Sequence, residues 1–136
     1  MAARSKARKR ALDILFESEM QRLDTGGSLA ARIESAVPPL NEYAIQLVEG
    51  VIAHRERIDE LLTTYSEGWT LDRMPGVDRN VLRIGAFEVL YCPDVPDPVA
   101  IDEAVKLAGE LSTDESPGFV NGLLGRLQEL KPTIMG

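Results

Sequence analysis

The chain has 136 residues, of which 44% are hydrophobic and 27% charged, a composition that suits one globular domain with a core of its own. No apolar run approaches the roughly 18 residues that a membrane-spanning helix needs, and acidic residues interrupt the first apolar stretch, so we expect a cytoplasmic protein without anchor or secretory signal. One cysteine and one histidine exclude an internal disulfide and a Cys/His zinc site. We therefore predict no metal, no cofactor and no enzymatic activity.

Positive charge is concentrated at the N-terminus. The chain has a formal net charge of −7, yet its first ten residues contain five cations and no acid. Such a basic end is typical of a surface that binds nucleic acid or an anionic membrane, while the acidic remainder would attract a basic protein. A basic tail that is merely solvated is the alternative. The five cations are Arg4, Lys6, Arg8, Lys9 and Arg10.

Apolar residues at helical spacing predict a first helix from about Ala7 to Leu23, which Gly26 and Gly27 would end. Arg8 and Arg4 continue the line of its apolar stripe toward the N-terminus. Because unpaired cations are too costly to bury, we expect the first turns of this helix to project into solvent.

Two further helices are predicted before the middle of the chain. A short one runs from about Ser28, its N-cap, to Ala36, and Pro38 and Pro39 follow it. The clearest helical stripe in the chain then predicts a long helix over about 41–65. The segment over 68–77 has neither helical nor strand periodicity, so we interpret it as a connector between two helical halves.

A fourth helix is predicted from Asp78, as its N-cap, to about Tyr91. Its apolar residues point in nearly every direction, which indicates a central helix. Arg83 and Glu88 inside it need partners or an edge, and they are either members of structural ion pairs or part of a binding surface.

The last two helices begin with similar signals. Asp97-Pro98 supplies a cap and a first-turn proline for the fifth, Ser116-Pro117 does so for the sixth, and Pro132 is expected to stop the sixth. An interior glycine costs about 1 kcal/mol against alanine, so a neighbouring helix or a ligand is expected to approach Gly118, Gly122 and Gly125. Since no stretch alternates between apolar and polar residues as a strand would, the predicted class is all-α with six helices.

Three blocks of this sequence resemble the NusB family of transcription antitermination factors. The first is ARKRALDILF at residues 7–16, similar to the family's arginine-rich start. The second is DRNVLRIGAFEVL at residues 78–90, similar to its central helix. The third and most specific block joins DVPDPVAIDEAV at residues 94–105 with SPGFVNGLLG at residues 116–125. Together the blocks cover nearly the whole chain.

The resemblance implies a fold and a function. The fold is a single domain of two packed three-helix bundles, with an N-terminal bundle over about 4–67, a connector over 68–77 and a C-terminal bundle over about 78–131. The function is to bind single-stranded boxA-type RNA of ribosomal RNA transcripts together with NusE, a small-subunit ribosomal protein, in the transcription elongation complex and in support of rRNA transcription.

The resemblance also implies site residues. Cations hold phosphates without reading sequence, whereas Phe119 can stack on an unpaired base and Asn121 can hydrogen-bond its edge; a core aromatic and a cap residue are the alternatives. Many family members carry lysine where this chain has Gly118, so weaker RNA binding is expected there. The first RNA strip is Arg4, Lys6, Arg8, Lys9 and Arg10, the second is Glu115, Ser116, Phe119 and Asn121, and the surface for NusE is Phe16, Met20, Asp78 and Arg83.

The alternatives are a different binding class and an enzyme. A helical protein-interaction module, such as a homodimer that covers its own apolar surface, would not bind RNA, and Phe16 and Met20 would equally suit a core. Domains similar to NusB also precede RNA methyltransferase catalytic domains, but no glycine-rich loop follows a strand in this sequence, and one histidine completes no catalytic constellation.

Overall fold

The computed structural model describes residues 2–136, and in that part of the chain it contains six α-helices, one short 3-10 helix and no strand. The all-α, six-helix prediction is confirmed. In chain order the elements are α1 (Ala2–Met20), α2 (Thr25–Ser35), α3 (Glu42–Tyr65), η1 (Leu71–Arg73), α4 (Gly76–Tyr91), α5 (Asp97–Leu111) and α6 (Ser116–Met135).

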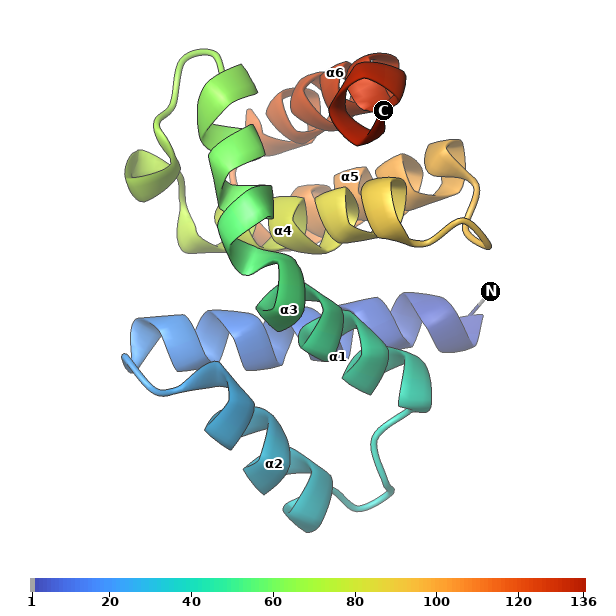
Figure 1. Ribbon diagram of the computed structural model, residues 1–136. Helices are drawn as coiled ribbons and strands as arrows, with labels where there is room; N and C mark the ends of the chain where they lie inside the picture. Colours follow the sequence, from blue (N-terminus) through green and yellow to red (C-terminus); the bar gives the residue numbers. More distant parts are fainter. Residues whose placement is uncertain (1) are drawn as a thin grey trace.

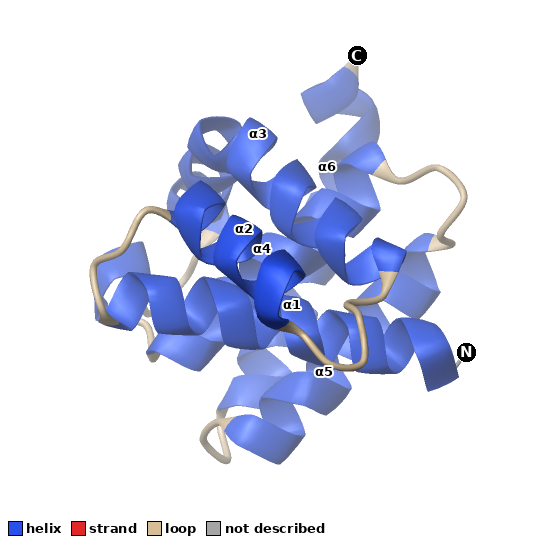
Figure 2. Ribbon diagram, turned by 90° about the horizontal axis from the view of Figure 1, so that it is seen from below, coloured by secondary structure: helices blue, strands red, loops and turns tan. Residues whose placement is uncertain are grey.

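The helices form two groups of three. α1 packs against α2 and α3, α4 packs against α5 and α6, and the groups meet where α3 and α1 contact α4. Figure 1 shows the long helix α3 crossing in front of both α1 and α4, so one helix joins the two groups. In Figure 2 the tan connections run over the outside of the helical body, one of them across the face toward the viewer. Within residues 2–136, no helix is long and apolar enough to cross a membrane.

The core lies where α1, α3 and α4 meet and continues between α4 and α6. Ile14 of α1, Leu47 of α3, and Leu82 of α4 are fully buried, as are Leu124 and Leu127 of α6. α4 buries most of its residues, polar ones included. The prediction that it is the central helix is confirmed, and its charged side chains must therefore find partners inside the protein.

The first two helices differ from prediction at their ends. α1 begins at Ala2 instead of Ala7 and ends at Met20, because the chain turns at Arg22, whose φ is 55°. Asp24 caps α2 by accepting a hydrogen bond from the Gly27 amide at 2.9 Å. Ser28 is therefore not the N-cap, and the two glycines belong to the first turn of α2.

Later boundaries show the same kind of difference. Asn41 caps α3, whose bounds match the prediction. α4 begins two residues before Asp78, which lies in its first turn, and Pro96 precedes α5 where Asp97 was expected as the cap. Pro132 lies inside α6 and does not stop it.

α3 and α4 approach closely at Gly50. A Cβ added there would lie 2.0 Å from Cζ and 2.3 Å from Cε1 of Phe87. We expect Gly50→Ala to lower the free energy of unfolding by about 1–3 kcal/mol, because the whole ring must shift. Urea denaturation measures this. The control is Gly118→Ala, because a Cβ at Gly118 meets nothing within 4 Å; it should leave stability unchanged or raise it by up to about 1 kcal/mol. If both variants lost the same stability, the close approach of α3 and α4 at Gly50 would be contradicted.

Candidate nucleic-acid interface

Arg8 lies inside the protein. Its guanidinium donates to both carboxylate oxygens of Glu88, from Nε at 2.9 and 3.1 Å and from Nη2 at 2.9 Å, and to Glu103 from Nη1 at 3.1 Å. The side chains of Arg8 and Glu88 are 4% and 1% exposed. The expectation that Arg8 projects into solvent is therefore wrong, because a cation can be buried where carboxylates pair with it. All three of its nitrogens already donate to carboxylates and its side chain is buried, so an RNA phosphate cannot reach it in this structure.

The Glu88 carboxylate also holds Tyr43, which in turn contacts Arg4. The Tyr43 hydroxyl donates to Glu88, and burial together with that carboxylate raises the pKa of Tyr43 far above its usual value. The Arg4 guanidinium lies 4.4 Å from the centre of the Tyr43 ring and donates to Asp94 at 3.2 Å. We call Arg8, Tyr43 and Glu88 the anchor network, and it fixes the start of α1 to α3 and α4.

The other three N-terminal cations point outward. Lys6, Lys9 and Arg10 are exposed, and none of the ion pairs among residues 2–136 involves them. The prediction of solvent exposure is confirmed for these three, which we call the exposed cations. They form a positive ridge on a helix that the anchor network holds in place.

Two grooves flank this ridge, and Lys6 lines both. One, of about 360 Å³, lies between α1 and α5 and includes Lys9 and Lys106. The other, of about 490 Å³, lies between α1 and the connection from α2 to α3. Sequence reasoning missed Lys106, because its pairing with Asp102 one helical turn away is the pattern of an ordinary solvated helix face.

The second predicted RNA strip is only partly accessible. Ser116 is fully buried, and its hydroxyl donates to Asp78 at 2.9 Å, so it shapes the start of α6 rather than facing a ligand. Phe119 is half-buried and meets Trp69 edge to face, with ring centroids 4.8 Å apart. Glu115 and Asn121 are exposed.

The two strips lie toward opposite ends of α4. Arg8 contacts Glu88 near the end of that helix, while Ser116 contacts Asp78 in its first turn. Ten helical residues correspond to about 15 Å, so the two strips are separate regions of the protein. An RNA strand that contacts both must extend over several nucleotides.

The glycines of α6 are not sites of close helix packing. A Cβ added at Gly118, Gly122 or Gly125 would meet nothing within 4 Å, so the expected approach of a neighbouring helix is wrong. Gly118 and Gly122 instead line an open cavity of about 350 Å³ together with Phe119. The absence of side chains keeps this part of the surface hollow.

The four residues predicted to face NusE separate into an accessible and a buried pair. Met20 is 50% exposed and Phe16 half-buried, and both approach Gly76, where an added Cβ would lie 2.8 Å from Phe16 Cε1 and 3.0 Å from Met20 Cε. Asp78 and Arg83 are 0% and 3% exposed, so a partner has no access to them in this structure.

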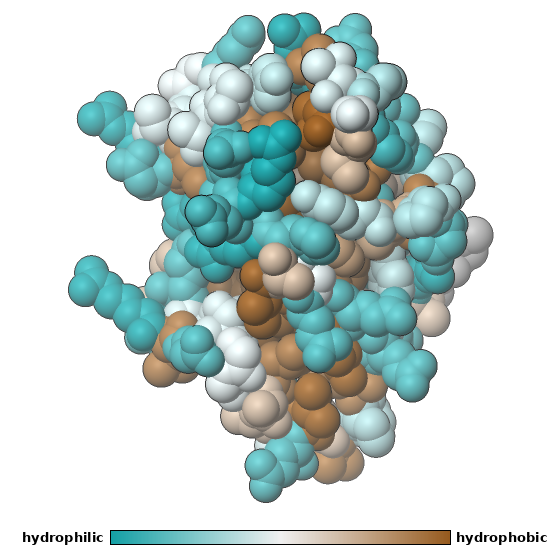
Figure 3. All heavy atoms as spheres, viewed as in Figure 1, coloured by the Kyte–Doolittle hydropathy of each residue, from teal (hydrophilic) through white to brown (hydrophobic). Residues whose placement is uncertain are grey.

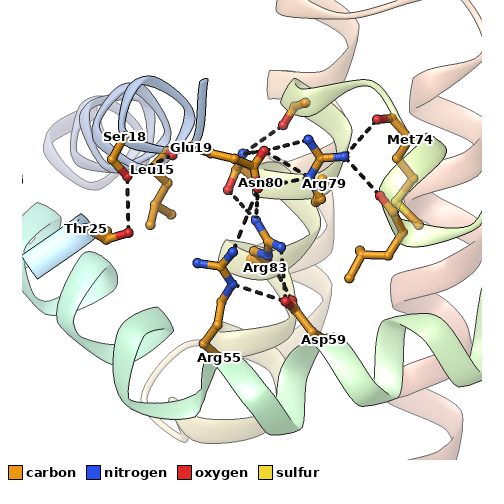
Figure 4. Close-up of polar contacts among 12 residues, drawn as sticks. Leu15, Ser18, Glu19, Thr25, Arg55, Asp59, Met74, Arg79, Asn80 and Arg83 are labelled. Carbon is orange, nitrogen blue, oxygen red and sulfur yellow. Dashed lines mark hydrogen bonds and ion pairs between the residues drawn. The ribbon is translucent and has the colours of Figure 1, made fainter. Parts of the chain in front are cut away.

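Arg83 belongs to a cluster of charges that joins α1, α3 and α4. Figure 4 shows Glu19 of α1 between Arg79 and Arg83 of α4, with Asp59 and Arg55 of α3 beside them. Arg79 Nη2 and Arg83 Nη1 donate to Glu19 at 2.6 and 2.7 Å, and Arg83 Nε donates to Asp59 at 2.9 Å. Burial opposes the ionisation of Glu19, but the two arginines outweigh it and lower its pKa to about 2.

This cluster predicts a loss of stability in acid. The pKa of Glu19 is lowered on folding from 4.5 to about 2, so its contribution is fully present above pH 4.5 and is lost as the pH falls through 2. We expect this group to lower the free energy of unfolding by about 2–3 kcal/mol over that interval, and Glu19→Gln to remove that part of the pH dependence. Urea denaturation at a series of pH values measures both proteins, and parallel profiles would show that Glu19 does not carry the effect.

Comparisons with known proteins agree with this fold. The sequence model of the NusB family matches residues 5–129. The chain is 58% identical over 135 residues to the transcription antitermination protein NusB of Arthrobacter sp. (strain FB24), covering 99% of each chain, and 61% identical over 134 residues to that of Kineococcus radiotolerans, covering 98% of each. The structure of NusB from T. maritima is similar with a TM-score of 0.83 and 33% identity, over 93% of this chain and 90% of that one. A structure of the antitermination factors NusB and NusE in complex with double-stranded RNA is similar with a TM-score of 0.82 and 26% identity, over 95% of this chain and 98% of that one.

Proposed function

The chain belongs to the NusB family, and from that premise we propose that it binds single-stranded RNA of the boxA type through the exposed cations of α1, together with the ribosomal protein NusE. Family membership makes it a transcription antitermination factor and not an enzyme. Our proposal concerns which RNA and which partner protein it binds, and which residues contact them.

The observation that carries the proposal is the ridge of Lys6, Lys9 and Arg10. These three cations have no carboxylate partner in the described part of the chain, although the protein as a whole is acidic. A phosphate backbone is the ligand that such a ridge favours, because its binding releases counterions and needs no sequence readout. The similar NusB–NusE complex that contains RNA supports the same class of ligand.

Other predicted RNA residues take different roles. Arg4 is 43% exposed and pairs with the exposed Asp94; such pairs contribute little, so Arg4 can turn to a phosphate. Arg8 is proposed to position the start of α1, since its side chain is buried and bonded to carboxylates. Phe119 and Asn121 are proposed to contact bases on a more distant part of the strand, where Ser116 holds the start of α6.

Recognition of NusE is proposed at the other end of α1. Phe16 and Met20 form an apolar surface beside α4, and the acidic charge of the chain favours a basic protein. We infer that this protein and NusE together join the transcription elongation complex in the cytoplasm and support transcription of ribosomal RNA.

The proposal is tested by titrating labelled boxA-type single-stranded RNA into the protein, with and without NusE, at several salt concentrations. Contacts of the exposed cations and Arg4 with four phosphates predict a log-log salt slope of about −3 and tighter binding with NusE. A flat slope would favour the alternative of a protein-interaction module without RNA binding. A duplex of the same sequence is the comparison, and preference for the duplex would contradict the single-stranded part of the proposal.

A further inference from the structure

A basic pocket lies on the α2 side of the ridge. It is the groove of about 490 Å³ between α1 and the connection from α2 to α3, and its size falls within the range of about 300–1,000 Å³ that small-molecule sites occupy. Its lining contains three cations and no acid. Lys6 and Arg10 come from α1, and Arg32 comes from the last turn of α2.

The connection from α2 to α3 gives this pocket an apolar wall. This wall consists of residues 36–40, in which Val37 is followed by Pro38 and Pro39. Val37 is 95% exposed, so its aliphatic side chain stands in water without a partner among residues 2–136. Proline fixes φ, which makes this wall stiff before any ligand arrives. On the face shown in Figure 3, apolar residues gather over the lower half of the molecule, where α2 and the start of α3 lie.

The cations of the pocket are available to an anion. Arg10 has no ion pair in the described part of the chain, and Arg32 pairs with Glu17 through one nitrogen at 2.6 Å. The side chains of Arg32 and Glu17 are 30% and 49% exposed. A solvent-exposed pair of this kind contributes at most about 1 kcal/mol, so a phosphate can displace the carboxylate.

We propose that this pocket holds one nucleotide of the bound RNA, with the base against Val37 and the two prolines and the phosphate on Arg10 and Arg32. An unpaired nucleotide carries a flat apolar face next to a charged phosphate, which matches a pocket lined by apolar residues and three cations. Lys6 lines both this pocket and the groove toward α5, so one strand can cross α1 at that residue. The inference rests on the proposed function and extends it to α2, where the sequence predicted no RNA contact.

Two variants test the pocket, each with a matched control. Arg32→Ala removes one of the three cations of the pocket. Its control, Arg57→Ala, removes an exposed, ion-paired arginine on α3. Val37→Asp places a negative charge in the apolar wall, and Ile52→Asp does so at the exposed Ile52 of α3. Anisotropy of labelled boxA-type single-stranded RNA is measured from about 50 to 200 mM salt, and the melting temperature of each variant is recorded.

Arg32→Ala is expected to weaken RNA binding about 5-fold and to make the salt slope shallower by at most about 0.7, the value for one phosphate on a single strand, because Arg10 still contacts the same phosphate. Val37→Asp should weaken binding about 10-fold, whereas both controls stay within about 2-fold of the unmodified protein. Unchanged binding by both pocket variants, while Lys9→Ala still weakens binding, would overturn the pocket and leave the proposed function intact. Binding of an acidic peptide that depends on Arg32, with RNA binding unaffected by Arg32→Ala, would also overturn it. Absence of RNA binding by the unmodified protein would remove the proposed function and this inference together.

Discussion

Replacing Glu88 by alanine is expected to lower the free energy of unfolding by about 3–5 kcal/mol, because it leaves the buried cation of Arg8 without its main partner. Glu88 accepts hydrogen bonds from Arg8 and Tyr43 and is 1% exposed. After the substitution only Glu103 would face the guanidinium, through one nitrogen. Urea denaturation monitored by circular dichroism measures the change.

The control for this prediction is Glu60→Ala. Glu60 forms an exposed ion pair with Arg57 on α3, and exposed pairs of this kind contribute less than about 1 kcal/mol. Glu88→Gln adds a second comparison, because it keeps the shape and can still bond to Arg8 while it removes the negative charge. If the Glu60 and Glu88 variants lost equal stability, the anchor network would not be what holds the start of α1.

Replacing Lys6, Lys9 and Arg10 together by alanine is expected to weaken binding of single-stranded RNA by about 100-fold, since each hydrogen bond to a charged group contributes about 1 kcal/mol or more. The salt slope should become shallower by about 2, because three phosphate contacts are lost. Anisotropy titrations across salt concentrations measure both quantities. Stability should change little, because all three side chains are exposed.

A variant that removes cations elsewhere on the protein distinguishes the effect of direct RNA contacts from the effect of net charge. Arg57 and Arg73 are both exposed and lie on α3 and η1. Their joint replacement by alanine should leave RNA affinity within about 3-fold, because charges beyond a Debye length of about 8–10 Å are screened. A loss per cation as large as that on α1 would mean that overall charge, and not the ridge, determines RNA binding.

The fold was predictable from sequence where periodicity and terminal signals agreed. α3 has both an unbroken apolar stripe and Asn41 as its cap, and its bounds were predicted correctly. α2 was predicted to be capped by Ser28, but Asp24 is its cap; serine and aspartate are comparable N-caps, so the residue type alone does not place the start of the helix. Pro132 lies inside α6 and does not stop it, contrary to the prediction from sequence.

The largest error in the candidate site concerned Arg8. The sequence places Arg8 and Arg4 in line with the apolar stripe of α1 and Glu88 inside the apolar α4, and nothing in the local pattern links these charges. The structure pairs Arg8 with Glu88, 80 residues further along the chain. Only the packing of α1 against α4 reveals that each charge is the partner of the other, and no local pattern carries that information.

The surface of the site was predictable in part. The exposure of Lys6, Lys9 and Arg10 followed from their charge together with their position off the apolar stripe. Arg32 and Lys106 were missed, since they come from other helices and join the ridge only through the fold. The glycines of α6 were expected to meet a neighbouring helix, yet their surface is open, because a glycine leaves the same pattern in sequence whether or not a neighbour fills its space.

The most direct test of the central claim is to map where RNA meets the protein. Titrating boxA-type single-stranded RNA into the ¹⁵N-labelled protein should shift backbone amide resonances over residues 5–10 and around Lys106, with little change at Glu56, Arg57 and Glu60, which are exposed on α3. Shifts that cluster on α3 and leave the first half of α1 unchanged would contradict the claim that a ridge of exposed cations, held in place by a buried Arg8–Glu88 pair, is the RNA-binding surface.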